Sequence, residues 1–100
     1  MSDRGSSVTI TSGSARPLRP LVEAAIQREI DLLSVGIRRT EQHIRAFEQQ
    51  HGMPSAEFLR RHQNDELAET LDMIDWIGEL RLLERLREKE TTLKELRFAD

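Results

Sequence analysis

Glu48 and His51 are the residues whose types and spacing come closest to a metal-binding motif, a Glu-x-x-His step. On a helix this spacing places a carboxylate and an imidazole on one face. Two such steps with added carboxylates form the di-iron sites of four-helix bundles. A dimer of helical hairpins could supply both steps, with Glu66 or Glu69 as further ligands. The alternative is that His51 ends a helix, where histidine is favourable beside the carbonyl end of the dipole. A chain rich in Glu contains such pairs by chance, so the sequence predicts no bound metal and no other cofactor.

No other group of residues is typical of catalysis. His43 and His62 stand in polar stretches without a Ser/His/Asp grouping, and the chain has no Gly-rich phosphate loop. Cysteine is absent, which excludes disulfides, thiolate nucleophiles and zinc–thiolate sites. The pairs Arg38-Arg39 and Arg60-Arg61 lack interleaved aromatic residues, and the net charge is −3. These features argue against direct nucleic-acid binding. We therefore expect a protein that is not an enzyme.

The most unusual stretch runs from residue 72 to 78. It contains the only tryptophan of the chain, which has carboxylate residues on both sides in the sequence. Buried tryptophans often dominate the binding energy of protein interfaces. Residues 57–79 also hold seven acidic residues against two basic ones, a balance that would attract a basic partner. The hypothesis is a partner-binding site made of Asp72, Asp75, Trp76 and Glu79. The favoured alternative is that Trp76 fills a gap between helices, and an interface between identical chains would satisfy both.

The helix that precedes this stretch is predicted by a heptad pattern. Ile30, Ile37 and Ile44 recur one heptad apart. Between and beside them stand Ile26, Leu33, Thr40 and Phe47, so that steps of four and three residues alternate along the series. This is the spacing of the a and d positions of a packed helix seam. The pattern predicts a helix from about Pro20 to His51, which Gly52 and Pro54 would end. The predicted dimer or helix seam consists of Ile30, Leu33, Ile37, Ile44 and Phe47.

Two further helices are expected after this one. Residues 54–62 predict a short helix, and a second long helix should run from about Asp65 to Phe98, capped by Asn64 or Asp65. A helical wheel divides its apolar residues between two sides, and a helix that is apolar on two sides needs two partners. The first helix, folded back antiparallel, would be one partner and a second copy of the chain the other. One side holds Leu67, Leu71, Leu82, Leu86, Leu93 and Leu96, and the other holds Met73, Trp76, Ile77, Leu80 and Leu83.

Length and composition favour one small helical domain. The chain has 100 residues, of which 37% are hydrophobic and 33% charged, so its core is thin and self-association would add burial. Residues 1–16 are rich in Ser and Gly and predict a flexible tail, with a short strand at 8–11 as the alternative, and residues 17–100 form the hairpin domain. No stretch predicts a membrane span or a signal peptide, so we expect no membrane association and a cytoplasmic location.

The run from Phe47 to Phe58 resembles a pattern found in small prokaryotic helical proteins. The pattern is an acidic helix end, an aromatic residue, Gly-Met, a small polar pair and then Glu-Phe. The resemblance covers about residues 21–97 and includes the Asp-rich stretch that ends in Trp76 and the closing Leu/Arg/Glu helix. It departs from the pattern at His51, where an aromatic residue is typical, and at 63–66, which lack a glycine turn. Many of these proteins are encoded beside small toxin-like proteins, so the resemblance implies an antitoxin-like role without catalytic residues.

The expected fold is all-α, with two long antiparallel helices in a helical hairpin and a short connecting helix. We expect it to dimerise into a four-helix-like bundle. The leading function is a protein-interaction module, the antitoxin-like partner of a small basic toxin whose active surface it would occlude. The alternatives are a structural homo-oligomeric coiled coil and a di-metal carboxylate protein of the ferritin type.

Overall fold

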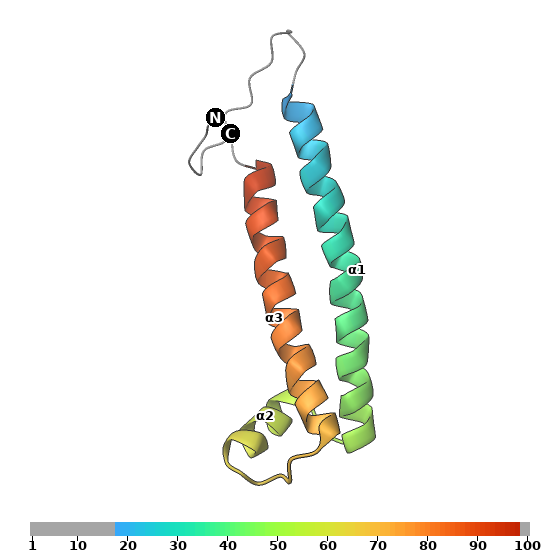
Figure 1. The fold of residues 1–100 in the computed structure, drawn as a ribbon, viewed down its shortest axis with the longest axis vertical. Coiled ribbons are helices and arrows are strands. Elements are labelled where there is room, and N and C mark those ends of the chain that lie inside the picture. The colour runs from blue at the N-terminus through green and yellow to red at the C-terminus, as the bar shows by residue number, and fades with distance from the viewer. Residues whose placement is uncertain (1–17, 99–100) are drawn as a thin grey trace.

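A computed structural model describes residues 18–98, and these residues form an all-α helical hairpin. Helix α1 spans Arg19–His51, α2 spans Ser55–Gln63 and α3 spans Leu71–Phe98. The long helices α1 and α3 run antiparallel side by side, and α2 lies at the end of the hairpin where they are connected (Figure 1). The predicted fold class is thereby confirmed. The expected tail at 1–16 and the alternative strand at 8–11 lie outside the described residues.

Helix α1 begins and ends where the sequence predicts. Pro20 lies in its first turn, where the missing N–H has no helical acceptor to lose. Gly52 follows the helix with φ 67°, in the left-handed region that glycine adopts without a Cβ penalty. The backbone N–H groups of Gly52 and Met53 both donate to the Glu48 carbonyl, which satisfies the last turn.

Helix α3 begins six residues later than the predicted start at Asp65. Asp65 has φ 55°, and its N–H donates back to the His62 carbonyl, so this segment closes α2 and does not cap α3. The cap is Thr70, whose Oγ1 accepts a hydrogen bond from Met73 N–H at 3.3 Å. The prediction of Asn64 or Asp65 as the cap is therefore wrong, and Leu67 lies outside the helix.

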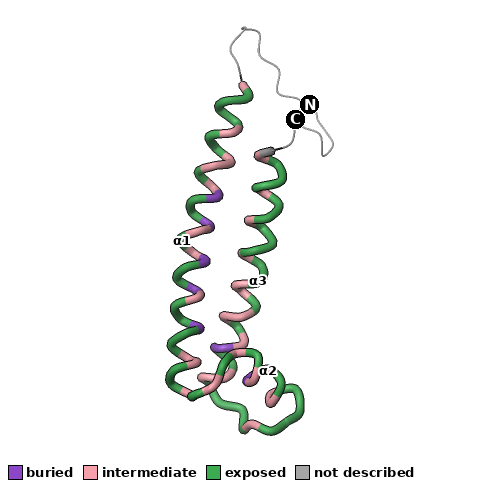
Figure 2. The backbone as a smooth tube through the Cα atoms, turned by 180° about the vertical axis from the view of Figure 1, so that it is seen from behind, coloured by how far each residue is buried: buried purple, intermediate pink, exposed green. Residues whose placement is uncertain are grey.

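The buried core follows the side of α1 that faces α3 (Figure 2). Thr40 interrupts the apolar series. Its hydroxyl donates a hydrogen bond to the Gly36 carbonyl one turn earlier in the helix, so this polar group is buried with a partner. Helix α2 and helix α3 each contribute one fully buried side chain, Phe58 and Trp76. The buried positions of α1 are Ile30, Leu33, Ile37, Thr40 and Ile44.

Helix α1 packs against residues from both of the sides into which the helical wheel divides the apolar residues of α3. Trp76 and Leu86, which the wheel places on different sides, both lie against α1: Trp76 stacks on Phe47, and Leu86 lies 3.7 Å from where a Cβ at Gly36 would be. Leu71, assigned to the same side as Leu86, is 79% exposed. Helix α1 therefore covers the boundary between the two sides. No helix within 18–98 has a stretch apolar and long enough to cross a membrane.

Candidate functional site

The three helices meet at an aromatic cluster built around Trp76. Its ring lies parallel to the Phe58 ring, with centroids 3.9 Å apart and an interplanar angle of 6°. Phe47 and His51 of α1 stack on the same indole, with centroid distances of 5.8 Å and 5.5 Å. Trp76 and Phe58 are both 0% exposed. The structure thus places Trp76 in the core of its own chain, as the structural interpretation of the sequence expected.

A chain of hydrogen bonds crosses this cluster through Ser55. The Trp76 indole N–H donates to Ser55 Oγ at 3.0 Å, and the Ser55 hydroxyl donates to Glu48 Oε2 at 2.7 Å. The same carboxylate oxygen accepts the Ser55 backbone N–H at 2.8 Å. Because Ser55 is the first residue of α2, the Glu48 carboxylate binds the positive end of that helix. Sequence reasoning missed this role, although a glutamate shortly before a Pro-Ser helix start is compatible with it.

His51 and Asp72 join the end of α1 to the start of α3. His51 Nε2 lies 3.3 Å from Asp72 Oδ2, and the same oxygen accepts a hydrogen bond from the Gln50 amide at 3.0 Å. Asp72 lies in the first turn of α3, where a carboxylate is favoured by the helix dipole. Glu48 and His51 therefore engage different partners. No group of three His, Cys, Asp or Glu residues among 18–98 could hold a metal ion.

Two of the four proposed partner-binding residues meet in a groove between α1 and α3. Asp75 is exposed and has no hydrogen-bond or ion-pair partner among the described residues. Glu79 Oε1 lies 3.3 Å from His43 Nδ1, and Ile74 beside them is 49% exposed. We call this the acidic groove. Its volume is about 560 Å³, and it is lined by His43, Ala46, Phe47, Gln50, Ile74, Asp75, Gly78 and Glu79.

The remaining two proposed residues, Asp72 and Trp76, do not line the acidic groove. Trp76 is fully buried, so it cannot contact a partner while the fold is intact. Asp72 accepts the hydrogen bond from Gln50 of α1 and is partly exposed. The structure therefore divides the four residues into an acidic pair that lines this groove and a pair that does not.

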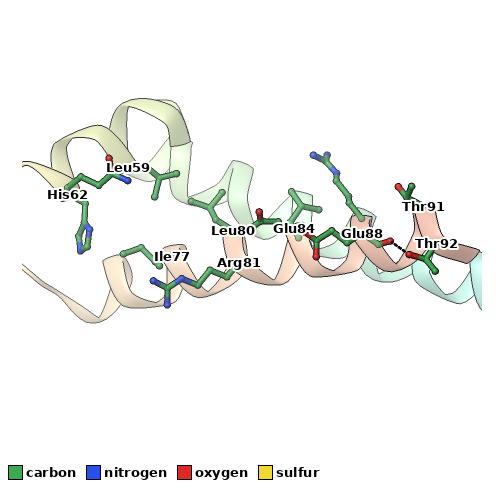
Figure 3. A pocket seen from close by; sticks show the side chains of 12 residues that line it. Leu59, His62, Ile77, Leu80, Arg81, Glu84, Glu88, Thr91 and Thr92 are labelled. Atoms are coloured by element: carbon green, nitrogen blue, oxygen red, sulfur yellow. Dashed lines mark hydrogen bonds between the residues drawn. The ribbon is translucent and has the colours of Figure 1, made fainter. Parts of the chain in front are cut away.

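A second groove lies between α2 and α3, and sequence reasoning did not identify it as a site. Leu59 and His62 of α2 form one wall, and the outer face of α3 forms the other (Figure 3). The spacing of Ile77 and Leu80 on one face of α3 was the signal that could have found it. We call it the α2–α3 groove. Its volume is about 1160 Å³, and its lining comprises Leu59, His62, Gln63, Ile77, Leu80, Arg81, Leu83, Glu84, Arg87, Glu88, Thr91 and Thr92.

The two basic residues of the acidic segment are paired with glutamates of the same segment, mainly with Glu57. Its carboxylate accepts hydrogen bonds from Arg60 at 2.9 Å and from Arg61 at 2.7 Å. These bonds, that from Arg60 first, lower the pKa of Glu57 below its ordinary value and raise the pKa of Arg60. Within residues 18–98, the arginines of α2 pair with Glu57 and Glu66 and not with Asp75 or Glu79, so the acidic groove keeps its negative charge.

Comparisons of the chain with family models, with curated proteins and with solved structures found no match.

Proposed function

We propose that this chain is a protein-interaction module that binds a basic segment of another protein in the acidic groove. The observation that supports this most is the grouping of Asp75 and Glu79 around the half-exposed Ile74. The apolar side chain offers a contact that excludes water, and the carboxylates beside it attract positively charged groups. Complementary charges of this kind accelerate association and select against acidic partners.

Gly78 adds a second reason to expect close contact in this groove. A glycine inside a helix costs about 1 kcal/mol relative to alanine. A Cβ at Gly78 would meet no atom within 4 Å, so packing inside the described part of the chain does not require glycine. In the wall of the acidic groove, the missing side chain leaves the α3 backbone open to a partner residue. The glycine is therefore consistent with a bound segment that lies against the helix.

In this proposal Trp76 does not contact the partner but holds α3 in the orientation that the acidic groove requires. Stacking on Phe58 and the hydrogen bond to Ser55 fix the rotation of α3 about its axis. Residues on a helix are separated by about 100° each, so fixing Trp76 also fixes the directions of Asp75 and Glu79. Its role is positioning, in place of the direct contact that the sequence suggested.

The class of partner follows from the resemblance to antitoxin-like proteins. The resemblance implies a small basic toxin-like protein, and an acidic groove suits the basic active surface that such a partner would present. The mechanism would be occlusion, in which the hairpin covers that surface without chemistry. The antitoxin-like role stays a prediction, and the acidic groove is the surface that we assign to it.

The resemblance implies that a small basic protein is encoded beside the gene of this chain, and the test uses that protein as the partner. Asp75→Asn with Glu79→Gln should slow association on the order of 10-fold at low salt and reduce its salt dependence. Stopped-flow kinetics at several salt concentrations measure both effects. Glu29→Gln with Glu95→Gln is the matched control, because it removes the same charge at the other end of the two long helices. Equal association rates for the two double variants would refute the assignment of this groove.

Gly78→Ala separates binding from folding. Alanine should stabilise α3 by up to about 1 kcal/mol, because the Cβ enters open space. The same Cβ should weaken partner binding, so stability and affinity should move in opposite directions. Thermal unfolding and isothermal titration calorimetry measure the two quantities. Unchanged affinity in this variant would contradict a close approach at Gly78.

A structural homo-oligomeric coiled coil is the second candidate function. It is favoured by the half-buried Ile77 and Leu80, which line the α2–α3 groove. If no basic partner binds while the chain still self-associates, this function replaces the first.

A further inference from the structure

The α2–α3 groove has an apolar floor that the hairpin leaves incompletely covered. Leu59 of α2 and Ile77 and Leu80 of α3 are half-buried, and they lie together at the end of the groove nearest α2 (Figure 3). The groove then continues along α3 as far as Thr92. An open apolar floor of this kind on a chain with few buried residues is a place where further burial would add stability.

Charges of both signs border this floor. Arg81, Glu84 and Glu88 are exposed, and none of their side chains has an ion-pair partner within residues 18–98. Arg87, by contrast, is paired with α1, since it lies 2.6 Å from Glu41. A partner of only one charge sign would meet repulsion from part of this rim, whereas a helix with the same charges in reverse order would meet attraction.

We propose that the α2–α3 groove is occupied by the same groove of a second copy of this chain, with the two α3 helices antiparallel. The inference uses a surface that shares no residue with the acidic groove, so it goes beyond the proposed partner binding, and it assigns a specific interface to the homo-oligomeric alternative. In a two-fold interface, if residue i contacts residue j of the partner, then j contacts i of the partner. Oppositely charged residues placed symmetrically along one helix therefore form two equivalent pairs.

The groove has the dimensions for this arrangement. It extends along α3 from Ile77 to Thr92, and the middle of that segment lies between Glu84 and Arg85. A two-fold axis at this point brings Arg81 opposite the partner's Glu88 and Ile77 opposite the partner's Thr92. Both ends of the groove are then covered by the same segment of the other copy. Ile77 then packs on the methyl group of the partner's Thr92, and the charged middle is paired.

Charge reversal followed by mixing tests this inference. Wild-type protein should be a dimer at micromolar concentration by sedimentation velocity. Arg81→Glu alone, and Glu88→Arg alone, should each raise the dimer dissociation constant on the order of 10-fold or more, because like charges then face each other. An equimolar mixture of the two variants should form a heterodimer, since one variant then presents glutamate and the other arginine at both positions, and both pairs have opposite charges. Native mass spectrometry distinguishes the heterodimer, and Arg38→Glu on the exposed face of α1 is the matched control.

Disulfide cross-linking tests independently whether the two copies meet at the proposed two-fold axis. The chain has no cysteine, so Glu84→Cys introduces a single thiol. It should form a covalent dimer on mild oxidation, whereas Arg38→Cys should not. A monomeric wild type, single reversals that leave dimerisation unchanged, a mixture that forms no heterodimer, or equal cross-linking at the two positions would each overturn the inference. Far-UV circular dichroism confirms that each variant is helical before its dimerisation is compared.

Discussion

Ser55 connects all three helices through one hydroxyl group. A hydroxyl can accept from one group and donate to another, so it lies between the indole N–H of Trp76 and the carboxylate of Glu48. Alanine could do neither. This explains why Glu48, the strongest candidate for a metal ligand in the sequence, acts as a cap of α2 in the structure.

Ser55→Ala should destabilise the chain by about 1–3 kcal/mol, because it leaves the buried indole N–H without an acceptor. Urea unfolding followed by the fluorescence of the single tryptophan measures the free energy of unfolding. Ser34→Ala is the control, since its hydroxyl makes only a 3.5 Å contact with Glu90, and its cost should stay within about 0.5 kcal/mol. Equal costs for the two variants would show that the Ser55 network contributes nothing specific.

Glu57 makes the stability of α2 sensitive to acid. Its pKa in the folded chain lies below its ordinary value of 4.5, because Arg60 and Arg61 donate hydrogen bonds to the carboxylate. The folded state thus binds the proton less readily than the unfolded state, so this stabilisation is present above about pH 4.5 and is lost as the pH falls through the folded-state pKa. An NMR titration of the Glu57 side chain should give a pKa below 4.5. Arg60→Gln with Arg61→Gln should return the pKa toward 4.5, and an unchanged pKa would show that the two arginines are not its cause.

At the scale of elements, α1 holds most of the core, and α3 depends on it. Five of the seven buried residues among those described belong to α1, and α3 contributes only Trp76. The regular heptad pattern of α1 places its buried residues, which are apolar except for Thr40, along one line, whereas the apolar residues of α3 spread around the helix. This spread leaves Ile77 and Leu80 beside α2, where a second surface is available.

Ile37→Lys should therefore unfold the hairpin or leave it strongly destabilised. The side chain of Ile37 is 8% exposed on the face packed against α3, and burying an unpaired ammonium there costs several kcal/mol. Val35→Lys is the matched control on the same helix, because Val35 is 50% exposed and a lysine there reaches solvent. Circular dichroism during heating should show a large decrease in melting temperature only for Ile37→Lys. Similar melting curves would contradict the packing of this seam.

At the scale of the whole molecule, the two grooves can be occupied at the same time. The acidic groove lies between α1 and α3, and the proposed dimer surface lies between α2 and α3. A dimer formed through the second would leave both acidic grooves open to basic partners. The two functions weighed from the sequence, partner binding and homo-oligomerisation, then describe different surfaces of one protein and do not compete for the same residues.

The sequence by itself determined the helical hairpin and most of its boundaries. Heptad spacing, the Gly52 stop and the proline at the start of α2 are local signals, because hydrophobic periodicity and backbone preferences act within a few turns of chain. These signals predicted α1 to within one residue and the short helix nearly as well. They also predicted that Asp75 and Glu79 would lie in one acidic region.

Only the tertiary structure decided how the residues at the connection are used. Asn64 and Asp65 have the chemistry of a helix cap, but α2 uses that segment for its own end, so the cap of α3 moves to Thr70. Glu48 and Trp76 meet through Ser55, which belongs to a third helix. Such contacts join residues far apart in the chain, and their partners are selected by how the helices pack. No local spacing encodes them, and for this reason only the tertiary structure distinguished the members of the proposed site that line the acidic groove from those that do not.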